Sequence, residues 1–262
     1  MNQVFAIAGT TLGEAIRRRV LLIILFVGLA FMIIAPSLSE LTPRGERHVL
    51  ITMTLAVLRI TAAILAVTLT VYLIPNEIER RTIYTILSKP VQRYQFLLGK
   101  YLGSVAALTL MIALMTIVLL AAFLFYQGAR SDIAPIVRSA IMFIFQMSLL
   151  AAVAMFFSTF VTPVVNFFLT GFVYIFGTLM NPIFENLTTK GQSTLVKGFA
   201  WVAHYIIPNF QNLDVTPGAA IEAAQQLRGS ELNFMMYGVV YSFTYIGILL
   251  ALSVLVFDRR EV

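Results

Sequence analysis

Long apolar segments constrain the fold of this chain more than any other feature of its sequence. A bilayer has a hydrocarbon core about 30 Å thick, and a helix needs roughly 20 apolar residues to cross it. Six segments approach that length and composition, at residues 20–36, 49–75, 101–126, 134–160, 162–181 and 234–257. Because 60% of the 262 residues are hydrophobic and 11% are charged, too little polar surface remains for a water-soluble body. The sequence therefore predicts an all-α, polytopic membrane protein with six transmembrane helices, forming a single domain over residues 1–262.

The residues before the first span form a segment of their own. Arg17, Arg18 and Arg19 precede the first apolar run, as in a cleaved signal peptide, but an apolar stripe with helical spacing comes before them. The residues of this stripe are Phe5, Ala8, Leu12, Ala15 and Ile16. The spacing favours an amphipathic helix over residues 1–19 that lies in the membrane interface. A helical extension of the first span is the alternative.

The distribution of basic residues predicts the topology. Lysines and arginines are enriched in the short loops that lie on the cytoplasmic side of a membrane. With a cytoplasmic N-terminus, the basic residues of the cytoplasmic segments are Arg17, Arg18, Arg19, Arg80, Arg81, Lys89, Arg93, Lys100, Arg259 and Arg260. The external segments then hold equal numbers of basic and acidic residues. We therefore expect both termini and the insert at 76–100 to be cytoplasmic.

Residues 182–233 form the long external region of this topology. The stretch TLVKGFAWVAHYIIPN within it mixes aromatic and polar residues and is too short to span the membrane. It favours an interfacial or partly re-entrant helix, with Trp201 and Tyr205 suited to the headgroup zone. The stretch AAIEAAQQLRG reads as a short helix that stops at Gly229. A plain surface loop with two small helices is the alternative, and the region is a candidate contact surface for an external partner protein.

The motifs of several enzyme classes are absent from the sequence. There is no cysteine, no HExxH pair and no GxSxG elbow, so a thiolate metal site, a zincin and an α/β-hydrolase are excluded. Gly99–Lys100 lacks the preceding glycine of a P-loop, since Tyr94 stands there. The basic residues sit at the ends of apolar runs, which argues against nucleic-acid binding. We expect no catalytic residue, metal or cofactor in this chain, and no enzymatic activity by itself.

A single charged residue, Arg59, lies near the middle of a predicted span. Such a residue costs at least about 2.5–3.5 kcal/mol at a helix centre, and the six spans contain no interior carboxylate to pair with it. We expect it to rely on carbonyls, hydroxyls, Gln146, water or a neighbouring chain. Arg59 and Gln146 are accordingly candidates for a substrate path that accepts an anionic group. A purely structural role, or a different span boundary, would also account for Arg59.

The insert at 76–100 has the pattern of an elbow at the membrane surface. Asn76 can cap a new helix, which would end near Ser88 because Lys89 precedes Pro90. The apolar stripe of this helix consists of Ile78, Ile83, Ile86 and Leu87. A second short helix would begin near Pro90 and run into the next span.

Two features of this elbow indicate what it contacts. Gly99 and Gly103 form a small-xxx-small pair that lets another helix approach closely. The amphipathic first helix fits the groove of a partner protein. A hairpin that merely connects two spans is the alternative interpretation.

The insert also carries the most specific motif of the chain. Its pattern E-x-E-x-x-T-x-x-x-x-L-S-x-P-V-x-R-x-x-F-x-x-G-K resembles permease subunits of ABC transporters of the type-2 exporter family. The matching residues are Glu77, Glu79, Thr82, Leu87, Ser88, Pro90, Val91, Arg93, Phe96, Gly99 and Lys100. The six spans, the basic N-terminal segment and the ending FDRRE resemble the same family, and IIPNFQNLD is similar to a Pro-Asn stretch of the nitrous-oxide-reductase-maturation permease subgroup. Arg81 departs from the glycine that many members have before the threonine, which leaves the subgroup and the substrate open.

The resemblance implies a mechanism and partners. Two permeases, either two copies or this chain with a related one, would pair in the cytoplasmic membrane of a bacterium or archaeon. Two copies of a separate ABC ATPase subunit would bind ATP and Mg below them and drive export through a coupling helix at 76–88. The residues implied to couple to the ATPase are Glu77, Glu79, Arg80, Arg81, Thr82, Ile83, Ile86, Leu87, Ser88, Pro90 and Arg93. An ion-coupled secondary transporter and a membrane scaffold for a larger complex are the alternative functions.

Overall fold

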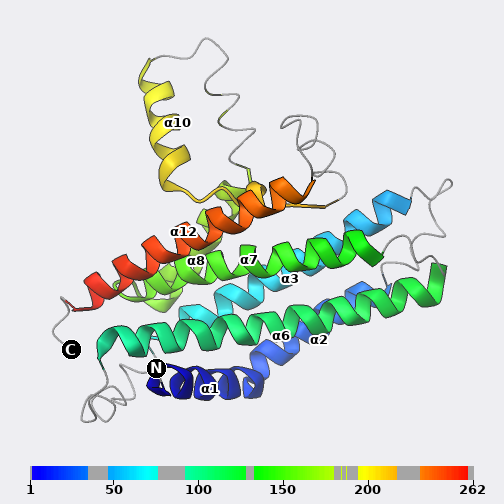
Figure 1. Ribbon diagram of the computed structural model, residues 1–262, viewed down its shortest axis with the longest axis horizontal. Coiled ribbons are helices and arrows are strands. Elements are labelled where there is room, and N and C mark those ends of the chain that lie inside the picture. Colours follow the sequence, from blue (N-terminus) through cyan, green and yellow to red (C-terminus); the bar gives the residue numbers. More distant parts are fainter. Residues whose placement is uncertain are drawn as a thin grey trace.

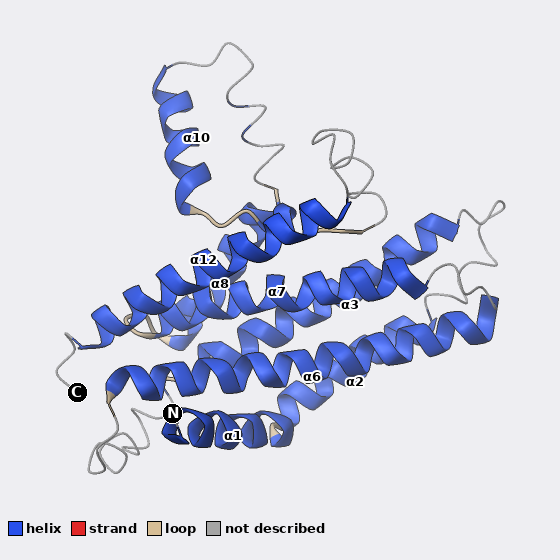
Figure 2. Ribbon diagram, viewed as in Figure 1, coloured by secondary structure: helices blue, strands red, loops and turns tan. Residues whose placement is uncertain are grey.

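The computed structural model describes residues 2–34, 47–75, 92–127, 133–179, 184, 187, 194–216 and 231–258. In these residues every regular element is a helix (Figures 1 and 2), so the predicted all-α class is confirmed. The elements are α1 (Asn2–Arg17), α2 (Arg19–Ile34), α3 (Arg47–Val71), α6 (Arg93–Gln127), α7 (Ile133–Ser158), α8 (Pro163–Thr178), α10 (Thr194–Ile206), the 3₁₀ helix η3 (Phe210–Leu213) and α12 (Glu231–Asp258).

Four helices are long and apolar enough to cross a membrane. Their apolar stretches are Ile51–Val71, Arg93–Phe125, Ile133–Ser158 and Leu232–Asp258. The helices α2 and α8 are apolar but have 16 residues each, or about 24 Å at about 1.5 Å per residue. They lie at the first and fifth predicted spans, so the count of six spans stays a prediction that depends on these two helices.

The helix α7 forms the centre of the bundle. The helices α3, α6, α7 and α12 run along the long axis of the molecule (Figure 1), and α7 contacts each of the other three as well as α8. Ala151, Ala152 and Ala154 of α7 are completely buried. Small residues let helix backbones approach closely, which drives helix association in lipid, where burial of apolar surface gives little advantage.

The helices α7 and α8 are joined by the tight turn that the sequence predicts. The helix α7 ends at Ser158 and α8 begins at Pro163, with Thr162 in the capping position. Proline is well suited to the first position of a helix because it lacks the N–H that would remain unpaired there.

The N-terminal segment is a separate helix that packs against α6. The chain leaves helical geometry at Arg18, and α1 lies beside the first turns of α6 (Figure 1). A Cβ atom on Gly99 would lie 2.8 Å from Ile7 Cβ, and one on Gly103 would lie 2.6 Å from the carbonyl oxygen of Ala8. The predicted close approach at the glycine pair is therefore confirmed, and α1 is the helix that approaches.

The predicted apolar stripe of α1 is divided between two environments. Ala15 is buried, whereas Phe5 and Ile16 are 64% and 40% exposed. Thr11, which lies outside the stripe, is buried opposite Gly103 and donates a hydrogen bond to the carbonyl of Ile7. Close contact with a glycine favours a small residue, and the hydroxyl is satisfied within its own helix.

Most of the predicted elbow lies outside the described residues. This holds for Glu77, Glu79, Arg80, Arg81, Thr82, Ile83, Ile86, Leu87, Ser88 and Pro90, whose roles stay predictions. The described part begins at Gln92, and α6 runs without a break from Arg93 through the span, as the sequence predicts. The last residues of the predicted elbow, from Arg93 onward, therefore belong to a continuous helix of 35 residues.

Candidate functional site

A segment without α-helix, at residues 207–216, is packed inside the helical bundle. It follows α10, includes η3, and contacts α7, α8 and α12. Its buried residues are Pro208, Asn209, Phe210, Leu213, Val215 and Thr216. A plain surface loop is therefore wrong for these residues, and we call 207–216 the re-entrant segment. Irregular backbone at membrane depth is tolerated only where protein groups satisfy its hydrogen bonds.

Side chains of α7 satisfy two carbonyls of the re-entrant segment. Gln146, at the middle of α7, donates from Nε2 to the carbonyl of Phe210 at 3.1 Å. Ser139, near the start of the helix, donates to the carbonyl of Val215 at 3.0 Å. The segment is thus held along α7, from the middle of that helix toward its N-terminal end.

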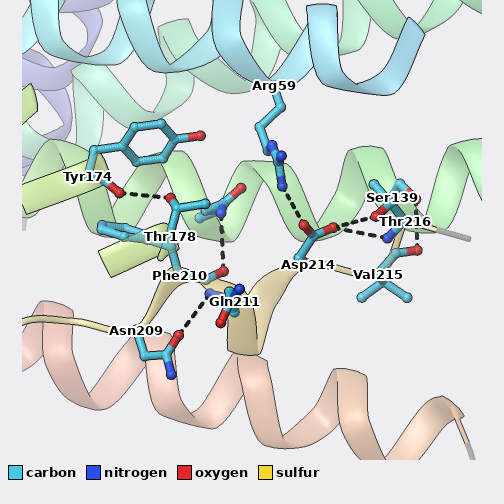
Figure 3. A network of polar contacts seen from close by, with 11 residues as sticks. Arg59, Ser139, Tyr174, Thr178, Asn209, Phe210, Gln211, Asp214, Val215 and Thr216 are labelled. Carbon is cyan, nitrogen blue, oxygen red and sulfur yellow. Dashed lines mark hydrogen bonds and ion pairs between the residues drawn. The ribbon is translucent and has the colours of Figure 1, made fainter. Parts of the chain in front are cut away.

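The helix α12 and the segment itself satisfy two of its backbone donors. The N–H of Asn209 donates to Tyr241 Oη of α12 at 2.8 Å. The side chain of Asn209 accepts from the N–H of Gln211 at 3.0 Å and so caps η3 (Figure 3). The Asn209 side chain and the Tyr241 hydroxyl therefore accept the backbone hydrogen bonds that water would accept in an external loop.

Two glycines create the space that this segment occupies. A Cβ atom on Gly177 of α8 would lie 2.3 Å from the carbonyl oxygen of Pro208. A Cβ atom on Gly238 of α12 would lie 2.6 Å from the carbonyl oxygen of Asn212. Both neighbours are backbone atoms, which cannot rotate away as a side chain can. The segment is therefore wedged between α8 and α12, and any larger residue at either glycine would push it out of place.

Arg59 of α3 forms an ion pair with Asp214 of the re-entrant segment (Figure 3). The guanidinium donates from Nη1 to Asp214 Oδ2, and the two side chains are 22% and 14% exposed. The other carboxylate oxygen, Oδ1, accepts from the N–H and the hydroxyl of Thr216, at 3.1 and 2.8 Å. Both oxygens of Asp214 are therefore engaged, and the carboxylate is held facing α3.

This pair corrects the expectation that no carboxylate lies at the depth of Arg59. The expectation was wrong because only residues inside the predicted spans were considered, whereas Asp214 arrives from a polar stretch that re-enters the bundle. A partly buried cation needs a counter-charge, and an uncompensated one would cost several kcal/mol. The signal available in the sequence was Asp214 itself, at the end of IIPNFQNLD.

Gln146 of α7 and Arg59 of α3 contact the same re-entrant segment, but through different residues of it. Its side chain is fully buried, and its Nε2 is occupied by Phe210. Within the described residues its Oε1 accepts no hydrogen bond, and the same holds for Oε1 of Gln211. The structure therefore brings the two candidate path residues to one polar region, Arg59 through Asp214 and Gln146 through Phe210. Their contact with a substrate stays a prediction.

Arg93 is the one predicted coupling residue that the structure describes. Its guanidinium donates to the carbonyls of Phe257 and Asp258, at 3.1 and 3.2 Å, in the last turn of α12. Lys100, about two turns of α6 further on, is buried and lies 4.0 Å from Glu14 of α1. The start of α6 thus contacts both the N-terminal helix α1 and the C-terminal end of α12.

No metal site was found in the part of the chain that the structure describes. No group of three or more His, Cys, Asp or Glu residues there is arranged to hold a metal ion.

A comparison with protein-family models matches residues 5–262 to the ABC-2 family transporter protein. This match covers all the described helices and the buried network, apart from the first residues of α1. The chain belongs to the ABC-2 transporter family. None of the curated proteins compared with the chain matches it.

Membership of the ABC-2 family identifies the general role of the bundle. The protein is a membrane component of an ABC transporter, a class that works together with an ABC ATPase subunit. The apolar helices agree with a multi-pass membrane protein. In this ABC-2 protein, the re-entrant segment places Asp214 and several backbone polar groups among the described helices.

Proposed function

We propose that this ABC-2 protein is the permease subunit of an ATP-driven exporter, in which a separate ATPase hydrolyses ATP and this chain moves the substrate. The observation that carries the proposal is the family match over residues 5–262. Two permease subunits, identical or related, would pair above two ATPase subunits in the cytoplasmic membrane of a bacterium or archaeon. Both termini and the elbow would face the cytoplasm, and α2 and α8 would complete six spans. Within this family, the stretch at 206–214 resembles the nitrous-oxide-reductase-maturation subgroup, to which we propose that the chain is related.

The packing at the start of α6 supports coupling to an ATPase. The residues predicted to touch the ATPase immediately precede Arg93, and α6 continues from there without a break. Close contacts at Gly99 and Gly103 join this end of α6 to α1, and Arg93 joins it to α12. A push on the elbow would therefore act on three helices together. Switches of this kind move packed elements as bodies, because a close-packed interface does not deform gradually.

The buried network supports a substrate path next to α3 and α7. Arg59 and Asp214 form a partly buried pair of opposite charges beside an apolar helix. At membrane depth, such polar groups usually mark a transport pathway. An anionic group on a substrate would compete with Asp214 for Arg59. Gln146 would adjoin the same path, through the carbonyl of Phe210 that it already binds.

One observation favours an ion-coupled secondary transporter as the second candidate. Such proteins place carboxylates at membrane depth, and Asp214 supplies one. The pairing with Arg59 argues against this function, since the carboxylate already has a counter-ion and both its oxygens are engaged. ATP-driven export is therefore the stronger proposal.

Purification of the native complex followed by reconstitution tests the proposal. We expect a protein with a Walker motif to copurify with the chain, and we expect substrate efflux in liposomes to require ATP. Transport that follows an ion gradient without ATP would establish the secondary transporter instead. Glu79→Lys and Arg81→Glu should weaken binding of the ATPase or uncouple its ATP hydrolysis from transport. Normal copurification and normal coupling in both variants would rule out the elbow as the docking element.

A further inference from the structure

The last turn of α12 is fastened to the first turn of α6. The final carbonyls of a helix have no partner within the helix, and a cation near them is favourable. Arg93 satisfies two such carbonyls, those of Phe257 and Asp258. Its guanidinium also lies 6.0 Å from the centre of the Phe257 ring, which stacks with Phe96 of α6 at 6.5 Å. Phe96 and Phe257 are both buried, so this joint combines directed hydrogen bonds with close packing.

The middle of α12 is fastened to the re-entrant segment. Tyr241 Oη accepts from the N–H of Asn209. Gly238, three residues earlier on α12, lies directly against the carbonyl of Asn212. From Tyr241 to Phe257 the helix rises about 24 Å, at about 1.5 Å per residue. One uninterrupted helix thus connects the elbow end of α6 with the segment that carries Asp214.

The helix α12 is also the least enclosed of the span-length helices. Only 17% of the most apolar stretch of α12 is buried against the rest of the chain, whereas the buried share is 72% for α7 and 67% for α3. Movement of a helix requires repacking of the surfaces that it buries against its neighbours, since protein interiors are close-packed. A helix with most of its surface free of such contacts can shift as a body at lower cost than α7 can.

We propose that α12 is the rod that transmits displacement of the elbow to the re-entrant segment. Arg93 is the positioning residue at the elbow end of this rod, and Gly238 and Tyr241 hold the other end. A shift of α12 along its axis moves Asn209 and Asn212. Because Asp214 follows Asn212 by only two residues, the shift also changes the bond between Asp214 and Arg59. This inference rests on the proposed function, because it takes the ATPase as the source of the displacement.

A cysteine reporter on the re-entrant segment tests the rod. The natural chain has no cysteine, so Asn212→Cys gives a single labelling site. The labelling rate of a maleimide is measured in the permease–ATPase complex in liposomes, without nucleotide and after trapping with ATP and vanadate. Coupling between sites commonly corresponds to about 5–150-fold, so we expect trapping to change the rate at least about fivefold. Arg93→Met, which removes the donors but keeps the length of the stem, should abolish most of this change, and Arg93→Lys should retain part of it.

The other end of the rod has closely matched controls on the same helix. Gly238→Ala and Tyr241→Phe should also reduce the nucleotide-dependent change, whereas Gly247→Ala and Tyr237→Phe should not. A Cβ atom on Gly247 meets no atom within 4 Å, and Tyr237 is 60% exposed. Copurified ATPase and nucleotide binding are measured for each variant, which separates loss of transmission from loss of assembly.

The outcomes separate this inference from the function on which it rests. An unchanged nucleotide response in assembled Arg93→Met complexes would overturn the rod and leave the proposed function standing. An equal loss of response in Gly247→Ala and Gly238→Ala would also overturn it, since the effect would not depend on contact with Asn212. A native chain that binds no ATPase would overturn the proposed function and the rod together.

Discussion

Arg59 and Asp214 are 155 residues apart in the chain and form an ion pair inside the helical bundle. Arg59 lies on α3, and Asp214 lies on the re-entrant segment, which three other helices hold in place. The pair compensates a partly buried cation of an apolar helix and fixes the end of the re-entrant segment against α3.

Removal of either partner should destabilise the protein. For Arg59→Gln and Asp214→Asn we expect a loss of about 1–3 kcal/mol each, toward the lower end of values for buried pairs because both side chains keep some solvent contact. The double variant should lose less than the sum, since neither charge is then left alone. Thermal unfolding in detergent measures these differences. Additive losses would show that the two side chains are not coupled.

Transport should distinguish a substrate contact of Arg59 from a structural role. Arg59→Lys keeps the charge but not the planar fork of donors, and Arg59→Gln removes the charge. If an anionic group of the substrate binds Arg59, transport should fall strongly in Arg59→Gln and partly in Arg59→Lys. Transport is compared at equal amounts of folded complex for the variants and the native protein. Unchanged transport in both variants would remove Arg59 from the substrate path.

Gly177 of α8 should be intolerant of any larger residue. Because a Cβ atom there would lie 2.3 Å from a backbone oxygen, Gly177→Ala forces the segment or α8 to move. Overpacking of this kind typically costs about 1–3 kcal/mol. Gly171→Ala is the control, since it lies on the same helix and its Cβ would meet no atom within 4 Å. The unfolding temperature should fall for Gly177→Ala alone, and a similar fall in both variants would contradict the close contact.

Gly103 should determine how α1 docks on α6. Gly103→Leu places a large side chain where the carbonyl of Ala8 and the side chain of Thr11 lie, so α1 should separate from α6. A Thr11→Cys reporter, buried in the native packing, should then react faster with a maleimide. Gly9→Leu is the control because a Cβ atom at Gly9 meets nothing within 4 Å. Equal labelling rates in the two variants would mean that Gly103 does not hold α1.

Local patterns in the sequence were sufficient for several features of the fold. Hydropathy gave the apolar helices, because burial in lipid depends on composition over a window of residues. Pro163 gave the break between α7 and α8, and the spacing of Gly99 and Gly103 gave a close helix contact. The ABC-2 family was also recognisable, from a motif that lies mostly in the elbow.

The identity of the contacting elements depended on the tertiary structure. Gly99 and Gly103 do not specify α1 as their partner, since many apolar helices would fit beside a small residue. Similarly, nothing near Arg93 in the sequence indicates that its donors reach the end of α12, 164 residues away.

By itself, the sequence determined an all-helical membrane protein with one cation within an apolar helix, and it predicted an elbow motif on the cytoplasmic side. Only the tertiary structure decided that Asp214 neutralises this cation and that residues 207–216 lie among the helices. The physical reason is that hydropathy measures how a segment partitions between water and lipid when it is alone. The re-entrant segment is too polar to partition by itself, and it enters the bundle because Gln146, Ser139 and Tyr241 supply the hydrogen bonds that water would otherwise make.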